Sequence, residues 1–301
     1  MEYAILGNAA FFAVAFAMQM GWLSWDMLGF GQDDDDDVAV KNPDPEPDPE
    51  DAKNTNYSAS GYASEQVGTS GNDTLGNSTS TESVALFGLT GNDSLVGSSS
   101  DDYFEGDAGN DTINGFSGND AAYGGSGDDL FYGLGGDDTL YGDGGDSIVG
   151  GGGKDVLNGG LGNDILSSDR LDSSADFSRG AGETLIGAEG EDTIIFSTAD
   201  QVSGGADTDT FNYVYRDVTS DPVVITDFDK DIDTLTVQYT PQTDGQGNPI
   251  VPAMSFEIDA STGETLIKLE GVVVTKLQGD ITISSSDVTL AEYDATFLDR
   301  L

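Results

Sequence analysis

The chain has 301 residues and contains neither cysteine nor histidine. Without cysteine it has no disulfide framework, no thiol nucleophile and no zinc finger. Without histidine it cannot form an HExxH zinc site or a Ser-His-Asp triad. The lack of cysteine is compatible with any redox compartment, so it does not locate the protein.

Basic residues are also scarce. Ten Lys and Arg stand against 56 Asp and Glu, which gives a formal net charge of −46. Proteins that bind nucleic acid through its phosphates need clustered Lys and Arg, so nucleic-acid binding is excluded. High charge with few aromatic residues favours disorder unless a counter-ion is present.

The N-terminal segment, residues 1–30, is apolar and carries no basic residue. Residues 4–25 are uncharged, and as a helix they would span about 33 Å, enough to cross a bilayer. A basic stretch of the kind that opens a secretory signal is missing here. We expect an apolar helix. Two roles stay open for it, a membrane or interface anchor and a helix that packs on a partner or is removed.

Residues 31–66 are acidic and rich in proline. They include the run DDDDD at 33–37 and PDPEPDPED at 43–51. Alternating proline favours an extended chain, and consecutive like charges repel one another and stay solvated. The segment is therefore predicted to be a disordered acidic linker.

Residues 67–212 repeat with a period of nine, and self-similarity at a fixed period is typical of solenoids. Positions 1, 2 and 4 of the unit are mostly glycine. Position 6 is acidic, as Asp73, Asp93, Asp102, Asp111, Asp120, Asp129, Asp138, Asp155, Asp164, Asp192 and Asp209, with Asp146 in a unit that is one residue short. Position 8 is apolar, as Leu75, Leu95, Phe104, Ile113, Ala122, Phe131, Leu140, Ile148, Leu157, Leu166, Ile194 and Phe211. We expect a six-residue turn followed by a three-residue strand with one inward side chain.

Stacking such units brings the position-6 aspartates together, at about the 4.8 Å spacing of strands. Two unit charges 4 Å apart repel by about 1 kcal/mol in water and about 4 kcal/mol at an intermediate dielectric. Residues 101–164 contain 14 acids and one base, Lys154, so internal ion pairs cannot neutralise the column. Calcium accepts six to eight oxygen ligands, whereas soft metals need ligands that this chain lacks. The aspartates at position 6 are thus predicted to bind Ca²⁺. Asp128 and Asp137, at position 5, are expected to face solvent.

Units such as GGSGDDLFY and GLGGDDTLY resemble the RTX (repeats-in-toxin) nonapeptide GGxGxDxUx, which builds a parallel β-roll that binds calcium. The resemblance implies an all-β fold, a calcium-binding nonapeptide solenoid in which two nonads form one coil. It also implies that each calcium is held by turn carbonyls and by position-6 aspartates two repeats apart. The implied pairs are Asp102 with Asp120, Asp111 with Asp129, Asp120 with Asp138, and Asp155 with residues of the neighbouring coils.

Some units depart from this pattern. The unit at 142–149 is one residue short around Asp146, and GSSSDDYFE lacks the inner glycines before Asp102. We expect weaker sites at these two acids. The isolated units around Asp73 and Asp192 are expected to be capping or partial sites.

Residues 213–301 lose the glycine rhythm and are predicted to form a small β-rich C-terminal domain. The expected strands lie in DPVVITDF, DTLTVQY, MSFEID, ETLIKLEGVVVTKL and DITIS, with a hairpin turn at DASTGE, residues 259–264. The region resembles the end of the roll in serralysin-type secreted proteins. There, acids equivalent to Asp227, Asp231 and Asp233 lie near a calcium or cap the sheet. TLIKLEGV and ATFLDRL resemble the C-terminal signal that type I secretion systems read, which implies export as an unfolded chain.

Taken together, these features predict a secreted, extracellular calcium-binding protein that folds on Ca²⁺ after type I export. Its expected partners are calcium ions and the type I secretion machinery, and its expected role is structural or at the cell surface, without enzyme activity. Two alternatives stay open. One is a non-catalytic module of a secreted polysaccharide-active enzyme, and the other is an adhesin anchored in the membrane through residues 4–25. The sequence does not indicate an oligomeric state.

Overall fold

The structure is a computed structural model that describes residues 61–168, 182–215, 221–279 and 281–293. The apolar helix expected at 4–25 lies outside these residues, as do most of the linker and the closing ATFLDRL. Across the described ranges, no helix has the length and apolar character needed to cross a bilayer.

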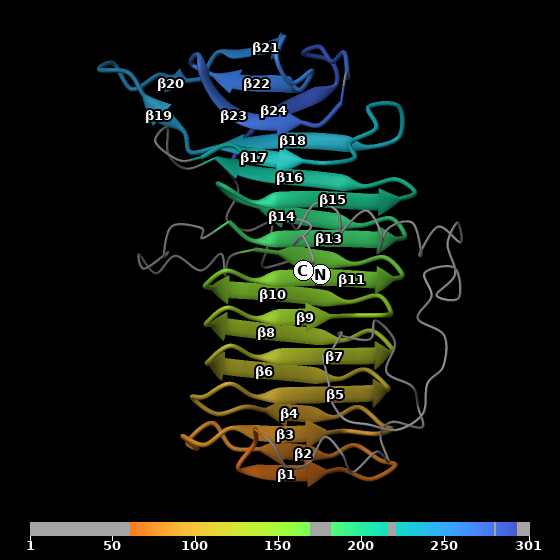
Figure 1. The fold of residues 1–301 in the computed structure, drawn as a ribbon. Coiled ribbons are helices and arrows are strands. Elements are labelled where there is room, and N and C mark those ends of the chain that lie inside the picture. The colour runs from red at the N-terminus through yellow and green to blue at the C-terminus, as the bar shows by residue number, and fades with distance from the viewer. Residues whose placement is uncertain (1–60, 169–181, 216–220, 280, 294–301) are drawn as a thin grey trace, which may run out of the picture. The chain divides into compact units, whose positions relative to one another are not determined.

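The described chain is built mainly from two long sheets, and from β1 to β18 it passes from one to the other after each strand (Figure 1). The 12-stranded sheet, here sheet A, contains in spatial order β1 (Ser64–Val67), β3 (Val84–Phe87), β5 (Tyr103–Ala108), β7 (Ala121–Ser126), β9 (Thr139–Tyr141), β11 (Val156–Leu161), β13 (Thr184–Glu189), β15 (Gln201–Ala206), β17 (Val223–Ile225), β23 (Val272–Leu277), β22 (Thr265–Leu269) and β21 (Met254–Ile258).

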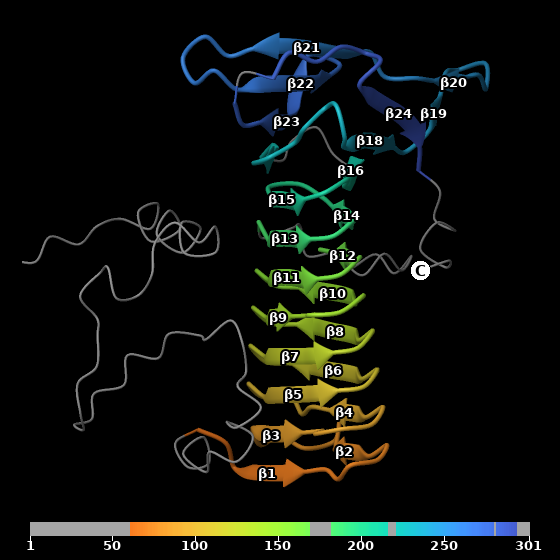
Figure 2. The same ribbon diagram turned by 90° about the vertical axis from the view of Figure 1, so that its right-hand side faces the viewer.

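The 10-stranded sheet, here sheet B, contains β2 (Thr74–Gly76), β4 (Ser94–Val96), β6 (Thr112–Ser117), β8 (Leu130–Gly135), β10 (Ser147–Gly152), β12 (Ile165–Ser167), β14 (Thr193–Phe196), β16 (Thr210–Tyr215), β18 (Thr234–Tyr239) and β24 (Val288–Glu292). A separate pair joins β19 (Gln242–Thr243) to β20 (Pro249–Ile250). Figure 2 shows the odd-numbered strands of the roll on one side and the even-numbered strands on the other. Because successive nonads enter opposite sheets, two nonads form one coil, as the RTX resemblance implied.

The core lies between the two sheets and is made of the position-8 side chains. In sheet B, Leu95 pairs in register with Ile113, and Ile113 with Phe131, and all three are buried. The same register in sheet A stacks Phe104 on Ala122. Eleven of the twelve predicted inward residues are buried, and Leu75, in the first coil, is partly buried against the core. Full burial of one such aliphatic or aromatic side chain contributes about 1.5–3 kcal/mol, which only stacked neighbours can supply.

Several strands are longer than predicted, and the three-residue expectation is wrong for them. Strand β8 continues from Tyr132 through the first three positions of the next nonad, and Leu134 pairs with Gly151 of β10. The glycine-rich turn therefore extends the parallel ladder instead of ending it, because its backbone groups also find partners in the adjacent coil. β1 likewise begins at Ser64, inside the predicted linker, since Glu65 pairs with Ala85.

Both sheets run on past residue 212, where the C-terminal domain was expected to begin. β18 pairs with β16 in parallel, and β24 pairs with β18 in the same direction. In sheet A, β23 pairs with β17 in parallel, and the pairs β23–β22 and β22–β21 that follow are antiparallel. The predicted turn at DASTGE is confirmed, because the Asp259 amide donates to the Glu264 carbonyl and the Gly263 amide donates to the Asp259 carbonyl.

The expected strand in DITIS is wrong. Residues 281–284 form no strand, and the chain instead turns at Ser284, whose amide donates to the Asp287 carboxylate over 2.6 Å. The strand of this region is β24, which begins directly after that turn. Ile283 is nevertheless buried, so the apolar character that suggested a strand serves the core.

Candidate metal centre

The position-6 acids form two columns, one in the turns that lead into sheet A and one in the turns that lead into sheet B. Column A precedes the strands of sheet A and contains Asp102, Asp120, Asp138, Asp155, Glu183 and Asp200. Column B precedes the strands of sheet B and contains Asp73, Asp93, Asp111, Asp129, Asp146, Asp164, Asp192, Asp209 and Asp233. All twelve acids predicted from the sequence lie in these columns. Eleven of them are at most 3% exposed, and Asp73 is half-buried.

Backbone hydrogen bonds to the Oδ1 atoms join the acids within each column. In column B, the amide of each acid from Asp73 to Asp209 donates to Oδ1 of the next acid over 2.7–3.0 Å. In column A, the Asp102 amide donates to Asp120 Oδ1 over 2.8 Å, and the Asp120 amide donates to Asp138 Oδ1 over the same distance. The expected neighbours are therefore adjacent. The ladder also places Asp155 beside Asp138.

The second carboxylate oxygen behaves differently. In nine acids Oδ2 is buried and has no hydrogen-bond partner, namely in Asp93, Asp111, Asp120, Asp129, Asp138, Asp146, Asp155, Asp164 and Asp192. A buried charge without a partner is costly, so these oxygens need a cation or a proton. The arrangement fits a cation that takes hard oxygen ligands.

Backbone carbonyls lie close to these oxygens. A methyl group added at Gly106 would lie 2.3 Å from Asp111 Oδ2 and 2.6 Å from the Gly124 carbonyl oxygen. The hydrogen at position 1 therefore leaves room where carboxylate and carbonyl oxygens from adjacent coils approach each other. Within the described part of the chain, no three acidic side chains form a metal-binding group, so a calcium ion here would draw its remaining ligands from carbonyls or water.

Burial raises the pKa values of most column acids, and neighbouring acids raise them further. The pKa of Asp120 and of Asp146 rises to about 8, and that of Asp129, Asp155 and Asp192 rises to about 7. In each case loss of water around the carboxylate is the largest cause, while the amide of the preceding column acid opposes it. The pKa of Asp111, Asp138, Asp164 and Asp209 rises to about 6.

The chain was compared with known proteins on this basis. Residues 86–113, 114–148 and 142–166 match the family model of the RTX calcium-binding nonapeptide repeat. This chain carries RTX calcium-binding nonapeptide repeats. The repeats form a calcium-binding β-roll, and the resemblance seen in the sequence is confirmed.

Two further comparisons add less. No curated protein sequence matches the chain. The solution structure of the AlgE6R3 subunit from the Azotobacter vinelandii mannuronan C5-epimerase is similar at 24% identity and a TM-score of 0.30, covering 51% of this chain and 78% of that one. At that identity and TM-score, nothing about the function of this chain follows from the epimerase.

The acids of the irregular RTX units still lie in the columns. Ser147 pairs with Leu130 in spite of the missing residue, and the Asp129 amide donates to Asp146 Oδ1 over 2.7 Å. The missing residue therefore shortens the turn and leaves the register of the strands unchanged. Asp128 and Asp137 are exposed, as predicted. The residues at position 5 are also joined by hydrogen bonds between adjacent coils, which the sequence did not suggest. For example, the Lys154 amide donates to Asp137 Oδ1 over 2.8 Å.

Two column acids, Glu183 and Asp200, were missed in the sequence, and a third, Asp233, was only implied by the resemblance to lie near a calcium or to cap the sheet. Glu183 and Asp200 belong to column A, in units that keep an acid at position 6 and an apolar residue at position 8 (Leu185 and Val202) without the full set of glycines. Burial and the nearby Glu183 carboxyl raise the pKa of Asp200 well above its usual range. Asp233 extends column B. A search for an acid followed two residues later by an apolar residue would have found all three.

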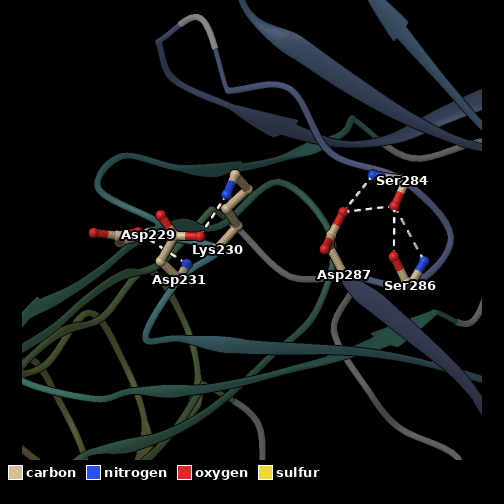
Figure 3. Close-up of polar contacts among 6 residues, drawn as sticks. All are labelled: Asp229, Lys230, Asp231, Ser284, Ser286 and Asp287. Carbon is tan, nitrogen blue, oxygen red and sulfur yellow. Dashed lines mark hydrogen bonds and ion pairs between the residues drawn. The ribbon is translucent and has the colours of Figure 1, made fainter.

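The acids of the turn after β17 do not converge on one point. Asp227 accepts hydrogen bonds from Ser203 Oγ and from the Gly204 and Gly205 amides. Asp231 is exposed and pairs with Lys230, and Figure 3 shows this turn apart from the polar group of Ser284, Ser286 and Asp287. Of the two roles implied for these acids, the contacts of Asp227 favour capping.

Proposed function

We propose that this chain is a secreted protein whose RTX β-roll folds on extracellular calcium after export by a type I secretion system. Its role is structural or at the cell surface, and it is not an enzyme. The observation that carries the proposal is the set of nine buried Oδ2 atoms without a hydrogen-bond partner. Folding buries these oxygens, so the folded roll needs a ligand that the chain itself does not supply.

Calcium then acts as the folding switch. Where calcium is scarce, the columns repel and the chain stays open, which suits passage through a secretion channel. Outside the cell, calcium binds the stacked state and stabilises it by RT ln(1 + [L]/Kd) at each site, so many weak sites sum to a large effect. The charge of −46 strengthens this dependence, because an uncompensated acidic chain resists compaction.

The absence of enzyme activity is proposed from the chemistry of the side chains. The whole chain has no histidine or cysteine for acid–base or nucleophilic work. The buried carboxylates of the described region bond to one another's backbone amides along the columns, which is a structural arrangement.

The folding proposal is tested by circular dichroism of the purified full-length chain. We expect little β-structure in EDTA and recovery of β-structure in millimolar calcium, together with calorimetric uptake of several calcium ions per chain. A spectrum that is identical in EDTA and in calcium would overturn the proposal.

The location is tested separately by expressing the chain with a type I exporter and fractionating the culture. Recovery in the medium supports secretion, whereas recovery in the membrane fraction supports an anchored adhesin. Incubation of the calcium-loaded protein with polysaccharides tests the proposed absence of enzyme activity, since turnover of any of them would contradict it.

A further inference from the structure

The Oδ2 atoms at the ends of the two columns are not like those in the middle. Each accepts a hydrogen bond from a backbone amide three or four residues earlier in its own turn. The four pairs are Asp73 with Thr69 (2.6 Å), Asp102 with Ser98 (2.5 Å), Asp200 with Ser197 (2.9 Å) and Asp233 with Asp229 (2.7 Å). The end acids are thus satisfied by the protein itself.

Hydroxyl side chains strengthen two of these contacts. Thr69 Oγ1 donates to Asp73 Oδ2 over 2.8 Å, and Ser98 Oγ donates to Asp102 Oδ1 over 3.1 Å. Ser and Thr commonly satisfy local backbone and carboxylate groups in this way. Each of these two carboxylates therefore receives two hydrogen bonds from a single residue at position 2 of its turn.

The backbone at position 2 explains why the middle acids lack this bond. In the units of the nine acids with an unpartnered Oδ2, the position-2 residue has a φ between 71° and 112°, as at Leu89, Asp107, Phe116, Gly125, Leu134, Asp143, Gly151, Gly160 and Ala188. Thr69 and Ser98 are not among the residues with positive φ. In the left-handed turns the amide can donate along the stack, as Asp143 does to the Gly159 carbonyl over 2.8 Å. In the end turns of Asp73, Asp102 and Asp233 it donates to its own aspartate instead, and in the turn of Asp200 the donor is the position-3 amide of Ser197.

The four hydrogen-bonded acids also stand at the boundaries of the columns. Asp73 is the first acid of column B, and Asp233 is its last. In column A the place before Asp102 is taken by Val84, whose amide donates to Asp102 Oδ1 over 2.8 Å. Asp200 is the last acid of that column. Among the nine acids with a buried, unpartnered Oδ2 and the four hydrogen-bonded acids, position along the stack and the hydrogen bonding of Oδ2 therefore change together.

We infer that the calcium-binding part of the roll consists of the nine acids with an unpartnered Oδ2, and that Asp73, Asp102, Asp200 and Asp233 are hydrogen-bonded caps that need no cation. This inference rests on the proposed calcium-dependent folding. It agrees with the capping or partial site expected at Asp73, and at Asp102 it replaces the weaker metal site expected from the sequence with a cap. The caps close the charged columns with amides, so that no calcium has to sit at an open end.

The test counts the calcium ions bound per full-length chain, by equilibrium dialysis with radioactive calcium, in matched pairs of variants. Column A is represented by Asp102→Asn and Asp120→Asn, and column B by Asp73→Asn and Asp111→Asn. At Asp73, where both Thr69 hydrogen bonds go to Oδ2, an amide side chain keeps the oxygen that accepts them. At Asp102, where Val84 donates to Oδ1 and Ser98 to Oδ2, it keeps one of the two acceptors. All four amide variants lose the charge that calcium requires. Circular dichroism in saturating calcium shows whether each variant folds.

We expect the cap variants to bind the same number of calcium ions as the unmodified chain, and each interior variant to bind at least one fewer. Loss of calcium from Asp102→Asn or Asp73→Asn equal to that from the interior variants would overturn the inference, as would full binding by Asp120→Asn and Asp111→Asn. If the unmodified chain itself bound no calcium, the proposed function would fail instead, so the two failures are distinguishable.

Discussion

At the scale of single residues, glycine at position 1 of each RTX unit is required by the carboxylate beside it. A methyl group at Gly124 would lie 2.3 Å from Asp129 Oδ2 and 2.8 Å from the ring of Phe131. Neither neighbour can retreat easily, because Phe131 is fully buried and Asp129 is held in its column. Position 1 therefore has an ordinary backbone conformation, but it has no room for a side chain.

The first prediction follows from that contact. Gly124→Ala should destabilise the calcium-loaded roll by about 1–3 kcal/mol, a typical cost of overpacking, and should weaken calcium binding. Urea denaturation in saturating calcium and a calcium titration measure the two effects. Gly71→Ala is the control, because nothing lies within 4 Å of the added methyl group. Equal urea midpoints for the two variants would contradict the steric argument.

The second prediction concerns the inward side chains. Phe131→Ala removes a fully buried ring from the core and should cost about 3–5 kcal/mol of folding free energy in calcium. Leu161→Ala, at a side chain that is 55% exposed, should change stability by no more than about 0.5 kcal/mol. Comparable losses of folding free energy at the two positions, measured by denaturant unfolding, would show that Phe131 does not stabilise the core as its burial indicates.

At the scale of elements, each acid column behaves as a unit because backbone amides link most of its members through Oδ1. The register places Asp146 in the column although its unit is short, so pairing between strands overrides a local deletion. The raised pKa values of the column acids are likewise a property of the stack. An isolated nonad would leave each carboxylate in water, near its ordinary pKa.

The third prediction is the pH dependence of the metal-free roll. The folded pKa values lie at about 6 to 8, above the unfolded value of 3.8, so the folded state binds more protons than the unfolded state between these limits. The metal-free roll should therefore be most stable at acidic pH and lose stability as the pH rises through about 6 to 8. Circular dichroism in EDTA should show more β-structure at pH 5 than at pH 8.

Calcium supplies the control for this experiment. At saturating calcium the β signal should stay nearly constant over the same range, because the cation replaces the proton on the column acids. An EDTA spectrum with as much β-structure at pH 8 as at pH 5 would contradict the proposed cost of the unneutralised columns.

At the scale of the whole molecule, the RTX roll is a stack in which each coil contacts only its neighbours, so calcium binding and folding are coupled along its length. Screening and coordination make different predictions for such a stack. Salt weakens repulsion between acids, but a monovalent ion does not supply the coordination that the buried Oδ2 atoms need.

The fourth prediction separates these two effects. Calcium should contract the full-length chain strongly, as measured by dynamic light scattering. Sodium chloride at roughly 1 M, where the Debye length is about 3 Å, should contract it only slightly in EDTA. Full compaction by salt alone would show that screening is sufficient and that bound calcium is not required.

The sequence by itself determined the nine-residue period, the inward residues, the twelve predicted acids of the two columns and the hairpin at residues 259–264. These features repeat locally or depend on a few neighbouring residues, so spacing and residue type reveal them. A unit with incomplete glycines, such as the one that contains Glu183, escaped the pattern although its acid and its apolar residue were in place.

Only the tertiary structure decided how long the strands are, which additional acids join the columns, and which Oδ2 atoms lack a partner. Each of these depends on the coil above or below, because a parallel ladder joins residues 17 to 28 positions apart. The difference between Asp102 and Asp120 is of this kind. The sequence suggested a weaker site at Asp102, but only the backbone turn at Ser98 shows that Oδ2 of Asp102 has a hydrogen-bond donor, whereas Oδ2 of Asp120 has none.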